Sequence, residues 1–306
     1  MKYRIWLDEW LKTCIKPRVK QRTLKRYSDI VRLQIEPKLG NVELTALTPT
    51  VLQNFIADLT VRYSANTVTG VISVLKGSLS RAQKMTLVKK QYSDAIEYPK
   101  PEEKIVKCFT RAEQKLIERA AFESNKPKLF GFVLCLYTGL RIGELLALEW
   151  NDLDLINRRI TVSKTCEDKW ENGKYIKQIT SPKTAASVRV IPIPPQLIPY
   201  IKSMKKYGKS RYVICGKAGK DVSVRSYQKS FYSTLKNINV NRRGFHTLRH
   251  TFATRALECG MDVKTLSKIL GHNSPVVTLR RYAHSLWEHQ DLMMNKLGKM
   301  LYSNSL

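Results

Sequence analysis

The spacing of apolar residues in the first 88 positions constrains the fold more than any other feature of this sequence. Tyr3, Trp6 and Trp10 recur every three or four residues, which is the spacing of one helix face. The same period returns between residues 68 and 82, and Thr48 before Pro49 is typical of a helix start. No alternating strand pattern interrupts these helices. We therefore expect residues 1–88 to form a small helical bundle.

The rest of the chain predicts a linker and a second, mixed domain. Residues 89–107 are rich in lysine and lack apolar periodicity, so they are expected to be a basic linker. Residues 108–306 begin with a capping box and contain β-rich runs at 159–165, 175–180 and 188–193 among helical segments. The last two runs are predicted to pair as a hairpin through residues 181–187. The expected fold is mainly α with a small antiparallel sheet.

The net charge points to a polyanionic partner. The chain of 306 residues has 54 Lys and Arg against 25 Asp and Glu, a formal charge of +29. Residues 1–100 alone hold 18 basic against 8 acidic residues, so both domains share the excess. Repulsion among so many positive charges opposes compaction of the chain. Proteins that carry such an excess of positive charge commonly bind nucleic acid.

Cysteine usage and hydropathy exclude other classes. The six cysteines are scattered without a C-x-x-C pair, which predicts reduced thiols in an intracellular protein rather than a disulfide framework or zinc ribbon. No uncharged stretch is long enough to span a bilayer, and no secretory signal is recognisable. We expect a cytoplasmic protein without a membrane partner, associated with the nucleoid when it is bound to DNA.

The candidate chemistry lies in short motifs of the second domain. All five histidines follow residue 245, but His246-Thr247-Leu248-Arg249-His250 lacks the glutamate and third ligand of a zinc-protease site, so no metal is expected. Taken singly, each motif is ambiguous, because an Arg can cap a helix and a Tyr can be core. The set in chain order is Thr138-Gly139-Leu140-Arg141, Glu144, Lys183, His246-x-x-Arg249, Leu270-Gly271-His272 and Tyr282.

This ordered set resembles the tyrosine recombinase (phage integrase) family, and the resemblance covers nearly the whole chain. It implies a helical core-binding domain and an α/β catalytic domain that clamp duplex DNA. Tyr282 would be the nucleophile, with Arg141, Arg249 and His272 around the phosphate. His246 would assist proton removal, Lys183 would protonate the leaving 5′ oxygen, and Glu144 would support Arg141. Lys174 and Lys177 lie close enough in sequence to compete with Lys183 for this role.

The residue types suit such chemistry on their own. A tyrosine that attacks a phosphodiester conserves the bond energy as a phosphotyrosine, so no cofactor is needed for rejoining. Two arginine forks match the non-bridging oxygens of a pentavalent phosphorane. The resemblance therefore implies a site-specific recombinase that acts through a 3′-phosphotyrosine and a Holliday junction. The alternatives are a type IB topoisomerase and a DNA-binding regulator with a dead site.

Two further surfaces are expected to bind partners. A basic run around the second helix is predicted to touch DNA phosphates, although a solvated basic face is the alternative. Its members are Lys16, Arg18, Lys20, Arg22, Lys25 and Arg26. The apolar stripe of the last helix is expected either to dock on a neighbouring protomer of a homo-tetramer or to pack in cis. Accessory DNA-bending or directionality proteins are further expected partners.

Overall fold

The computed structural model of the chain divides into two compact units, Met1–Lys104 and Ile105–Leu306. It describes residues 1–89, 96–99, 107–124, 126–181, 188–207, 210–272, 274–282 and 287–303. The boundary between the units falls inside the segment expected to be a basic linker. Each unit has its own hydrophobic core, as expected of a domain that folds by itself.

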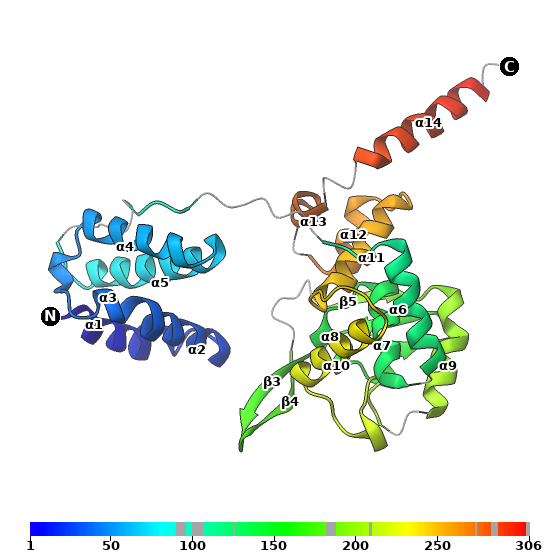
Figure 1. The fold of residues 1–306 in the computed structure, drawn as a ribbon, viewed down its shortest axis with the longest axis horizontal. Coiled ribbons are helices and arrows are strands. Elements are labelled where there is room, and N and C mark those ends of the chain that lie inside the picture. Colours follow the sequence, from blue (N-terminus) through cyan, green and yellow to red (C-terminus); the bar gives the residue numbers. More distant parts are fainter. Residues whose placement is uncertain are drawn as a thin grey trace. The chain divides into compact units, whose positions relative to one another are not determined.

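The first unit is a helical bundle, shown in blue to cyan in Figure 1. Its α-helices are α1 (Tyr3–Trp10), α2 (Gln21–Ile30), α3 (Glu36–Leu39), α4 (Pro49–Arg62) and α5 (Ala65–Lys84). π-helical turns extend two of these helices, η1 (Leu11–Ile15) after α1 and η2 (Val31–Ile35) after α2. The predicted cap at Thr48 is present, because its hydroxyl accepts a hydrogen bond from the backbone N–H of Val51. The buried faces of α1, α4 and α5 meet in the core.

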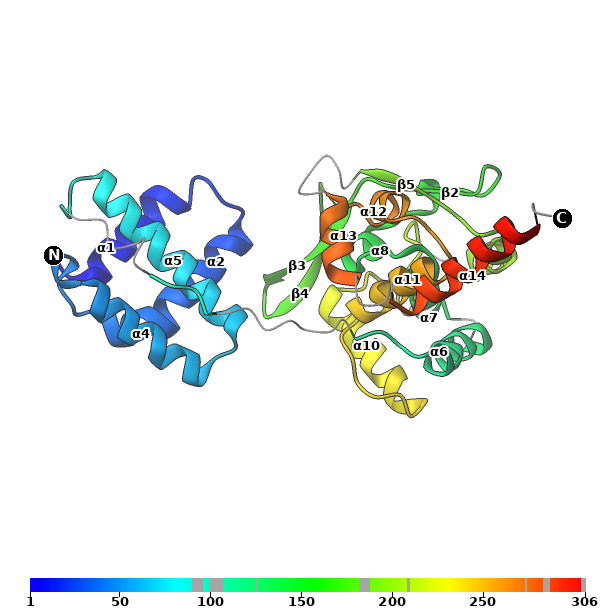
Figure 2. The same cartoon turned by 90° about the horizontal axis from the view of Figure 1, so that it is seen from above.

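The second unit surrounds a small set of strands with helices (Figures 1 and 2). Its α-helices are α6 (Arg111–Ser124), α7 (Pro127–Thr138), α8 (Ile142–Ala147), α9 (Ile198–Tyr207), α10 (Val224–Asn237), α11 (His246–Glu258), α12 (Val263–Leu270), α13 (Pro275–Tyr282) and α14 (Trp287–Ser303). The capping box predicted at Thr110 and Glu113 is formed in both directions. The aromatic core includes Phe132 and Phe231, both fully buried.

Two separate antiparallel sheets replace the single hairpin expected from the sequence. Strands β1 (Leu153–Asp154), β2 (Arg159–Val162) and β5 (Arg189–Pro192) form one sheet in the order β1-β2-β5. Strands β3 (Thr165–Glu171) and β4 (Lys174–Thr180) form the other, a hairpin that projects from the unit (Figure 1). The predicted pairing of 175–180 with 188–193 is therefore wrong.

The physical reason is the turn at Asn172-Gly173. Both residues have positive φ, 48° and 75°, which is the geometry of a two-residue hairpin loop. This turn pairs β4 with β3, where Glu171 faces Lys174, and leaves β5 to pair with β2. The Asn-Gly signal was present in the sequence and would have predicted the correct hairpin.

The remaining expectations about the chain concern thiols and hydropathy. The six cysteines, all within the described residues, form no disulfide, and four of them are buried. Among the described residues, no helix combines the length and apolar character needed to cross a membrane.

Candidate active site

The last turn of α12 collects three arginine side chains from distant parts of the second unit. Arg189 Nε donates to the carbonyl of Ile269 at 2.6 Å, and Arg249 Nη2 donates to the carbonyl of Leu270 at 2.7 Å. Arg141 Nη2 donates to the carbonyl of Gly271 at 3.1 Å. Carbonyls at a helix C-terminus lack partners within the helix and form the negative end of its dipole, so they favour cations. This turn is the frame of the candidate site.

Glycine is required where α12 ends. Gly271 has φ of 63°, the left-handed conformation that closes a helix, and the N–H of His272 then donates back to the carbonyl of Ser267. A Cβ at position 271 would lie only 3.0 Å from Cδ of Arg189. Gly271 therefore caps α12 and turns the chain so that His272 follows directly after the three carbonyls.

Arg141 precedes α8, and Glu144 fixes its direction. The backbone N–H of Arg141 donates to Glu144 Oε2 at 2.8 Å, and its Nη1 donates to Glu144 Oε1 at 2.8 Å. The Glu144 side chain is 6% exposed, whereas that of Arg141 is 36% exposed. The carboxylate therefore holds the guanidinium from the protein side and leaves it accessible to a ligand.

Arg189, on β5, binds the same carboxylate through both ends of its fork. Nη1 donates to Glu144 Oε1 at 2.9 Å and Nη2 to Oε2 at 2.8 Å, with both side chains buried. Burial by itself would raise the pKa of Glu144, but the hydrogen bonds and charge of Arg189, with the charge of Arg141, lower it to about 2. The cluster is therefore two cations that share one ionised carboxylate.

Arg249 and His272 form a second chain of contacts. Arg249 is only 2% exposed, and its Nη1 donates to the carbonyl of Gly139 at 2.7 Å. His272 Nε2 lies 3.0 Å from Arg249 Nη2, and its Nδ1 lies 2.7 Å from the hydroxyl of the buried Thr278. An arginine cannot accept, so Nε2 accepts here and the ring proton is assigned to Nδ1, which donates to Thr278.

The Thr278 contact ties α13 to the site. Thr278 lies on α13 four residues before Tyr282, which is the last residue of this helix. The side chain of Tyr282 itself lies outside the described residues.

The structure brings some of the predicted site residues together and leaves others apart. Arg141, Glu144, Arg249 and His272 converge on the α12 turn. His246 is exposed, and its ring packs edge-on against His250 with centroids 4.6 Å apart. Lys183 lies outside the described residues, in the connection between β4 and β5. These two strands belong to different sheets, so they do not form the hairpin that was expected to carry Lys183.

The two lysines that compete with Lys183 have contacts of other kinds. Lys174 is exposed at the tip of the β3–β4 hairpin. Lys177 Nζ lies 2.9 Å from the centroid of the Tyr212 ring and 3.9 Å from Asp221. Burial lowers the pKa of Lys177 to about 8, in spite of the opposing charge of Asp221. Lys177 thus lies against the Tyr212 ring and near Asp221, and its buried Nζ has no hydrogen-bond partner among the described residues.

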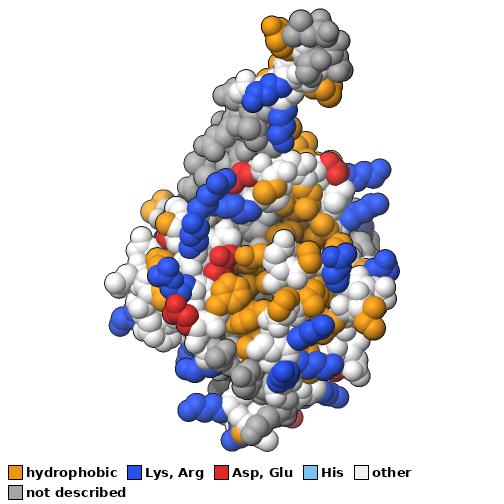
Figure 3. Space-filling view, turned by 90° about the vertical axis from the view of Figure 1, so that its right-hand side faces the viewer, with side chains coloured by type: hydrophobic (Ala, Val, Ile, Leu, Met, Phe, Trp, Pro, Cys, Tyr) orange, Lys and Arg blue, Asp and Glu red, His pale blue; other side chains and the backbone are white. Residues whose placement is uncertain are grey.

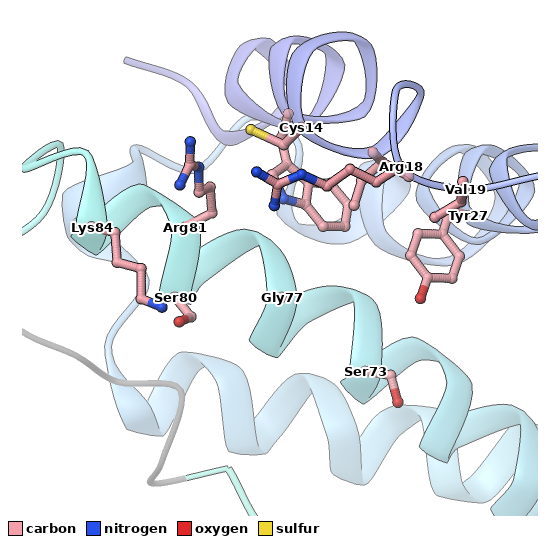
Figure 4. Close-up of a pocket in the computed structure, with 11 residues that line it drawn as sticks. Cys14, Arg18, Val19, Tyr27, Ser73, Gly77, Ser80, Arg81 and Lys84 are labelled. Atoms are coloured by element: carbon pink, nitrogen blue, oxygen red, sulfur yellow. The ribbon is translucent and has the colours of Figure 1, made fainter.

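The six basic residues predicted to touch DNA are all exposed. With the described residues they form no ion pair, so their charge is not neutralised within this part of the chain. Arg18 lines a pocket of about 320 Å³ between η1 and α5, together with Arg81 and Lys84. Figure 4 shows Arg18 reaching into this space from one wall, while Arg81 and Lys84 extend in different directions from α5.

Sequence reasoning missed Arg189, Thr278, Arg81 and Lys84. Arg189 stands in a β-rich run as an ordinary strand cation, and only the packing of β5 against α12 reveals its role. Thr278 carried a usable signal, because it lies one helical turn before the proposed nucleophile. Arg81 and Lys84 follow the apolar period of α5 on its polar side, where a cation has no distinguishing mark in sequence.

Comparisons with known proteins identify the family of the chain. Residues 98–289 match the model of the phage integrase family, and residues 3–60 match that of the phage integrase N-terminal SAM-like domain. The chain therefore belongs to the phage integrase family. Both the expected family and the expected fold class, mainly α with small antiparallel sheets, are confirmed.

Individual relatives are mobile-element or XerC-like proteins. A tyrosine recombinase XerC-like protein of Caldanaerobacter subterraneus subsp. tengcongensis is 34% identical over 209 residues, 60% of this chain. The chain spans about half of that relative, 52% of its length. The integrase of a Staphylococcus phage is 27% identical over 329 aligned positions, covering 97% of this chain and 92% of its own.

Solved structures of integrases share the fold. The Tn1549 transposon integrase in complex with a circular intermediate DNA has a TM-score of 0.82 at 22% identity, covering 97% of this chain and 99% of that one. A lambda integrase tetramer bound to a Holliday junction has a TM-score of 0.69 at 21% identity, covering 90% and 78%. At this identity the likeness extends to the fold.

Proposed function

We propose that the chain is a site-specific DNA recombinase that cleaves and rejoins duplex DNA with Tyr282 as its nucleophile. The observation that carries the proposal is the α12 turn, where Arg141, Arg249 and His272 converge from three elements onto one position. The family match places the chain among integrases, and its relatives are named integrases, transposases and recombinases.

The proposed reaction assigns separate roles to Tyr282, Lys183 and His246. The Tyr282 phenolate attacks the scissile phosphorus, forms a 3′-phosphotyrosine and displaces the 5′ oxygen of the next nucleotide. Lys183 donates the proton that makes this oxygen a hydroxyl. His246 assists removal of the proton from Tyr282, because a free tyrosine has a pKa near ~10 and is protonated at pH 7. Attack by the 5′ hydroxyl of a second strand reverses these steps and rejoins the DNA.

Arg141 and Arg249 supply the anion clamp. Their carbonyl and carboxylate partners fix the direction of the guanidinium groups before the substrate arrives, so little reorganisation accompanies the transition state. No metal or cofactor takes part in the proposal, because two guanidinium groups and an imidazole can share the added charge of the phosphorane. His272 would donate to the same oxygens once its Nε2 carries a proton, since in this structure that atom accepts from Arg249.

Double-stranded DNA is the proposed partner of both units. In the first unit, the exposed run from Lys16 to Arg26 and the pocket of Arg18, Arg81 and Lys84 present cations between η1 and α2, on α2 and on α5. A phosphate is the anion that duplex DNA offers to such groups, and each neutralised phosphate releases counterions. The lambda relative is bound to a Holliday junction as a tetramer, which supports a homo-tetramer on DNA here.

The exposed apolar residues of α14 suit this assembly. Leu297, Met300 and Leu301 are 43%, 57% and 58% exposed. Figure 3 shows hydrophobic side chains gathered on one face of the molecule with Lys and Arg around them. Docking of α14 on a neighbouring protomer would cover its stripe, whereas accessory proteins remain an expectation from the family alone.

The test begins with trapping of a covalent adduct. Purified protein is incubated with fragmented DNA from the source genome, stopped with detergent, and the DNA that stays attached is sequenced. We expect the wild type to yield adducts at a defined sequence and Tyr282→Phe, which removes one oxygen and little volume, to yield none while it still binds DNA. Adducts in Tyr282→Phe would assign the nucleophile elsewhere, and no adduct in the wild type would overturn the proposal.

A second assay separates the proposed reaction from nicking and resealing of one duplex. Two duplexes that carry the recovered sequence are mixed with the protein, and exchanged products are measured. Recombined duplexes support a recombinase. Relaxation of supercoils with no exchange would support the topoisomerase alternative.

A further inference from the structure

Arg189 connects three elements of the second unit through one buried side chain. It belongs to β5, its fork binds Glu144 on α8, and its Nε binds the carbonyl of Ile269 on α12. Its exposed fraction is 9%. A buried arginine that satisfies a carboxylate and a helix end at once fixes the relative position of both elements.

The Glu144 contact transmits this constraint to Arg141. Oε1 of Glu144 accepts from both Arg141 Nη1 and Arg189 Nη1, at 2.8 and 2.9 Å. Oε2 accepts from the backbone N–H of Arg141 and from Arg189 Nη2, both at 2.8 Å. The plane of the carboxylate, and with it the direction of the Arg141 fork, is therefore set from both sides.

The contact with α12 reaches Arg249 by a second route. Ile269, whose carbonyl Arg189 holds, immediately precedes Leu270, whose carbonyl Arg249 holds. Arg189 also packs on the next residue, because a Cβ on Gly271 would lie within 3.2 Å of its Cδ, Nη1 and Nε atoms. The turn that orients Arg249 and precedes His272 thus rests on the side chain of Arg189.

We propose that Arg189 is a positioning residue for DNA cleavage, which holds Arg141 and Arg249 in the directions that phosphoryl transfer requires. Arg189 reaches the reacting phosphate only through these two residues. The inference rests on the proposed recombinase function and adds a residue to it. Removal of residues that orient metal ligands typically costs about 10- to 100-fold in activity, and we expect a loss of the same order for a residue that orients the arginines.

The first experiment measures single-turnover cleavage at saturating DNA, on a duplex carrying the sequence recovered by adduct trapping. Arg189→Met keeps the length of the side chain and removes its charge and its fork. We expect cleavage to slow about 10- to 100-fold while the DNA dissociation constant stays within about twofold of wild type. Arg159→Met is the matched control, because Arg159 is an exposed cation on the neighbouring strand β2. This variant should cleave at the wild-type rate.

The second experiment distinguishes positioning from loss of folded protein. The scissile phosphate is replaced by a methylphosphonate, in which a methyl group replaces one non-bridging oxygen and removes its negative charge. With less charge to stabilise, cleavage depends less on a well-directed guanidinium. The deficit of Arg141→Ala should therefore shrink on this substrate, and the deficit of Arg189→Met should shrink with it.

The outcomes are distinct. An equal deficit of Arg189→Met on both substrates would mean a smaller folded fraction and would overturn the inference, as would a wild-type rate on the normal phosphate. If Arg189→Met is insoluble, Arg189→Lys, which keeps the charge but loses the fork, is measured by the same criterion. Absence of a covalent adduct in the wild type would refute the proposed function itself and is visible before any variant is compared.

Discussion

The arginines of the two units are held in opposite ways. In the second unit, Arg189 and Arg249 are buried, and backbone carbonyls and one carboxylate fix them. In the first unit, Arg18 and Arg22 are exposed and form no ion pair with the described residues. A donor fixed before the substrate arrives lowers the barrier of a reaction, whereas an exposed cation exchanges counterions and contributes affinity. The proposed function therefore assigns the fixed arginines of the second unit to catalysis and the exposed arginines of the first unit to DNA binding.

The largest effect should follow from Lys183→Ala. This substitution tests a cation proposed to act on the leaving 5′ oxygen, whereas the arginines are proposed to act on the non-bridging oxygens. The 5′ alkoxide is a poor leaving group, so loss of the proton donor should slow cleavage about 10²- to 10⁴-fold. With sulfur at the bridging 5′ position the leaving thiolate needs no proton, since a thiol pKa is near ~8.5, and the variant should approach the wild-type rate.

The controls for this prediction are other cations of the unit. Arg141→Ala should stay slow on the sulfur substrate, because its role concerns the non-bridging oxygens. Rescue of Lys174→Ala or Lys177→Ala instead would show that the assignment of Lys183 is wrong.

A slightly smaller effect is expected for Arg249→Lys, which keeps the charge of the buried clamp and loses its fork. A lysine cannot bond the carbonyls of Gly139 and Leu270 with the same geometry, and loss of a preorganised donor costs about 10²- to 10³-fold in rate. The measurement is single-turnover cleavage with the DNA dissociation constant determined in parallel. A variant that cleaves normally but binds poorly would place Arg249 with the affinity residues.

The exposed cations of the first unit should affect binding alone. Substituting glutamine for Lys20, Arg22 and Arg26 should make the negative slope of log K against log salt less steep. The expected change is about 0.9 for each DNA phosphate that is no longer neutralised. The cleavage rate at saturating DNA should stay unchanged. An unchanged salt slope would assign these residues to a solvated surface.

The smallest effect concerns the acid stability of the buried carboxylate. Glu144 has a pKa of about 2 in the folded chain against an ordinary 4.5, so its contribution to stability is complete above pH 4.5 and is lost as the pH falls toward 2. Glu144→Gln should therefore lose less stability than the wild type between these values. Urea unfolding at several pH values measures the free energy of unfolding of both proteins. Parallel losses in the two proteins would contradict the pKa assigned to Glu144.

The sequence was sufficient for elements set by local rules. Helical periods, the Thr48 cap and the Thr110–Glu113 box depend on neighbouring residues, and all were predicted. The strand pairing was not, because the Asn172-Gly173 turn was overlooked and β2 pairs with β5 across an intervening hairpin.

The candidate site divides along the same line. Motif order identified Arg141, Arg249 and His272, which the fold brings to one turn. It did not identify Arg189 or Thr278, because their roles depend on contacts with Glu144 and His272 that are made only when distant segments pack together. Nor did it predict that Arg249 would be buried with carbonyl partners.

The most direct test of the contrast between fixed and exposed arginines is the rate of covalent-adduct formation at saturating DNA, compared for Arg249→Lys and for the Arg18→Gln/Arg22→Gln pair. We predict that Arg249→Lys is at least about 10²-fold slower than wild type. The Arg18→Gln/Arg22→Gln protein should reach the wild-type rate once enough DNA is added. A wild-type rate for Arg249→Lys, or a rate deficit in the other protein that saturation does not restore, would contradict the division between catalytic and binding cations.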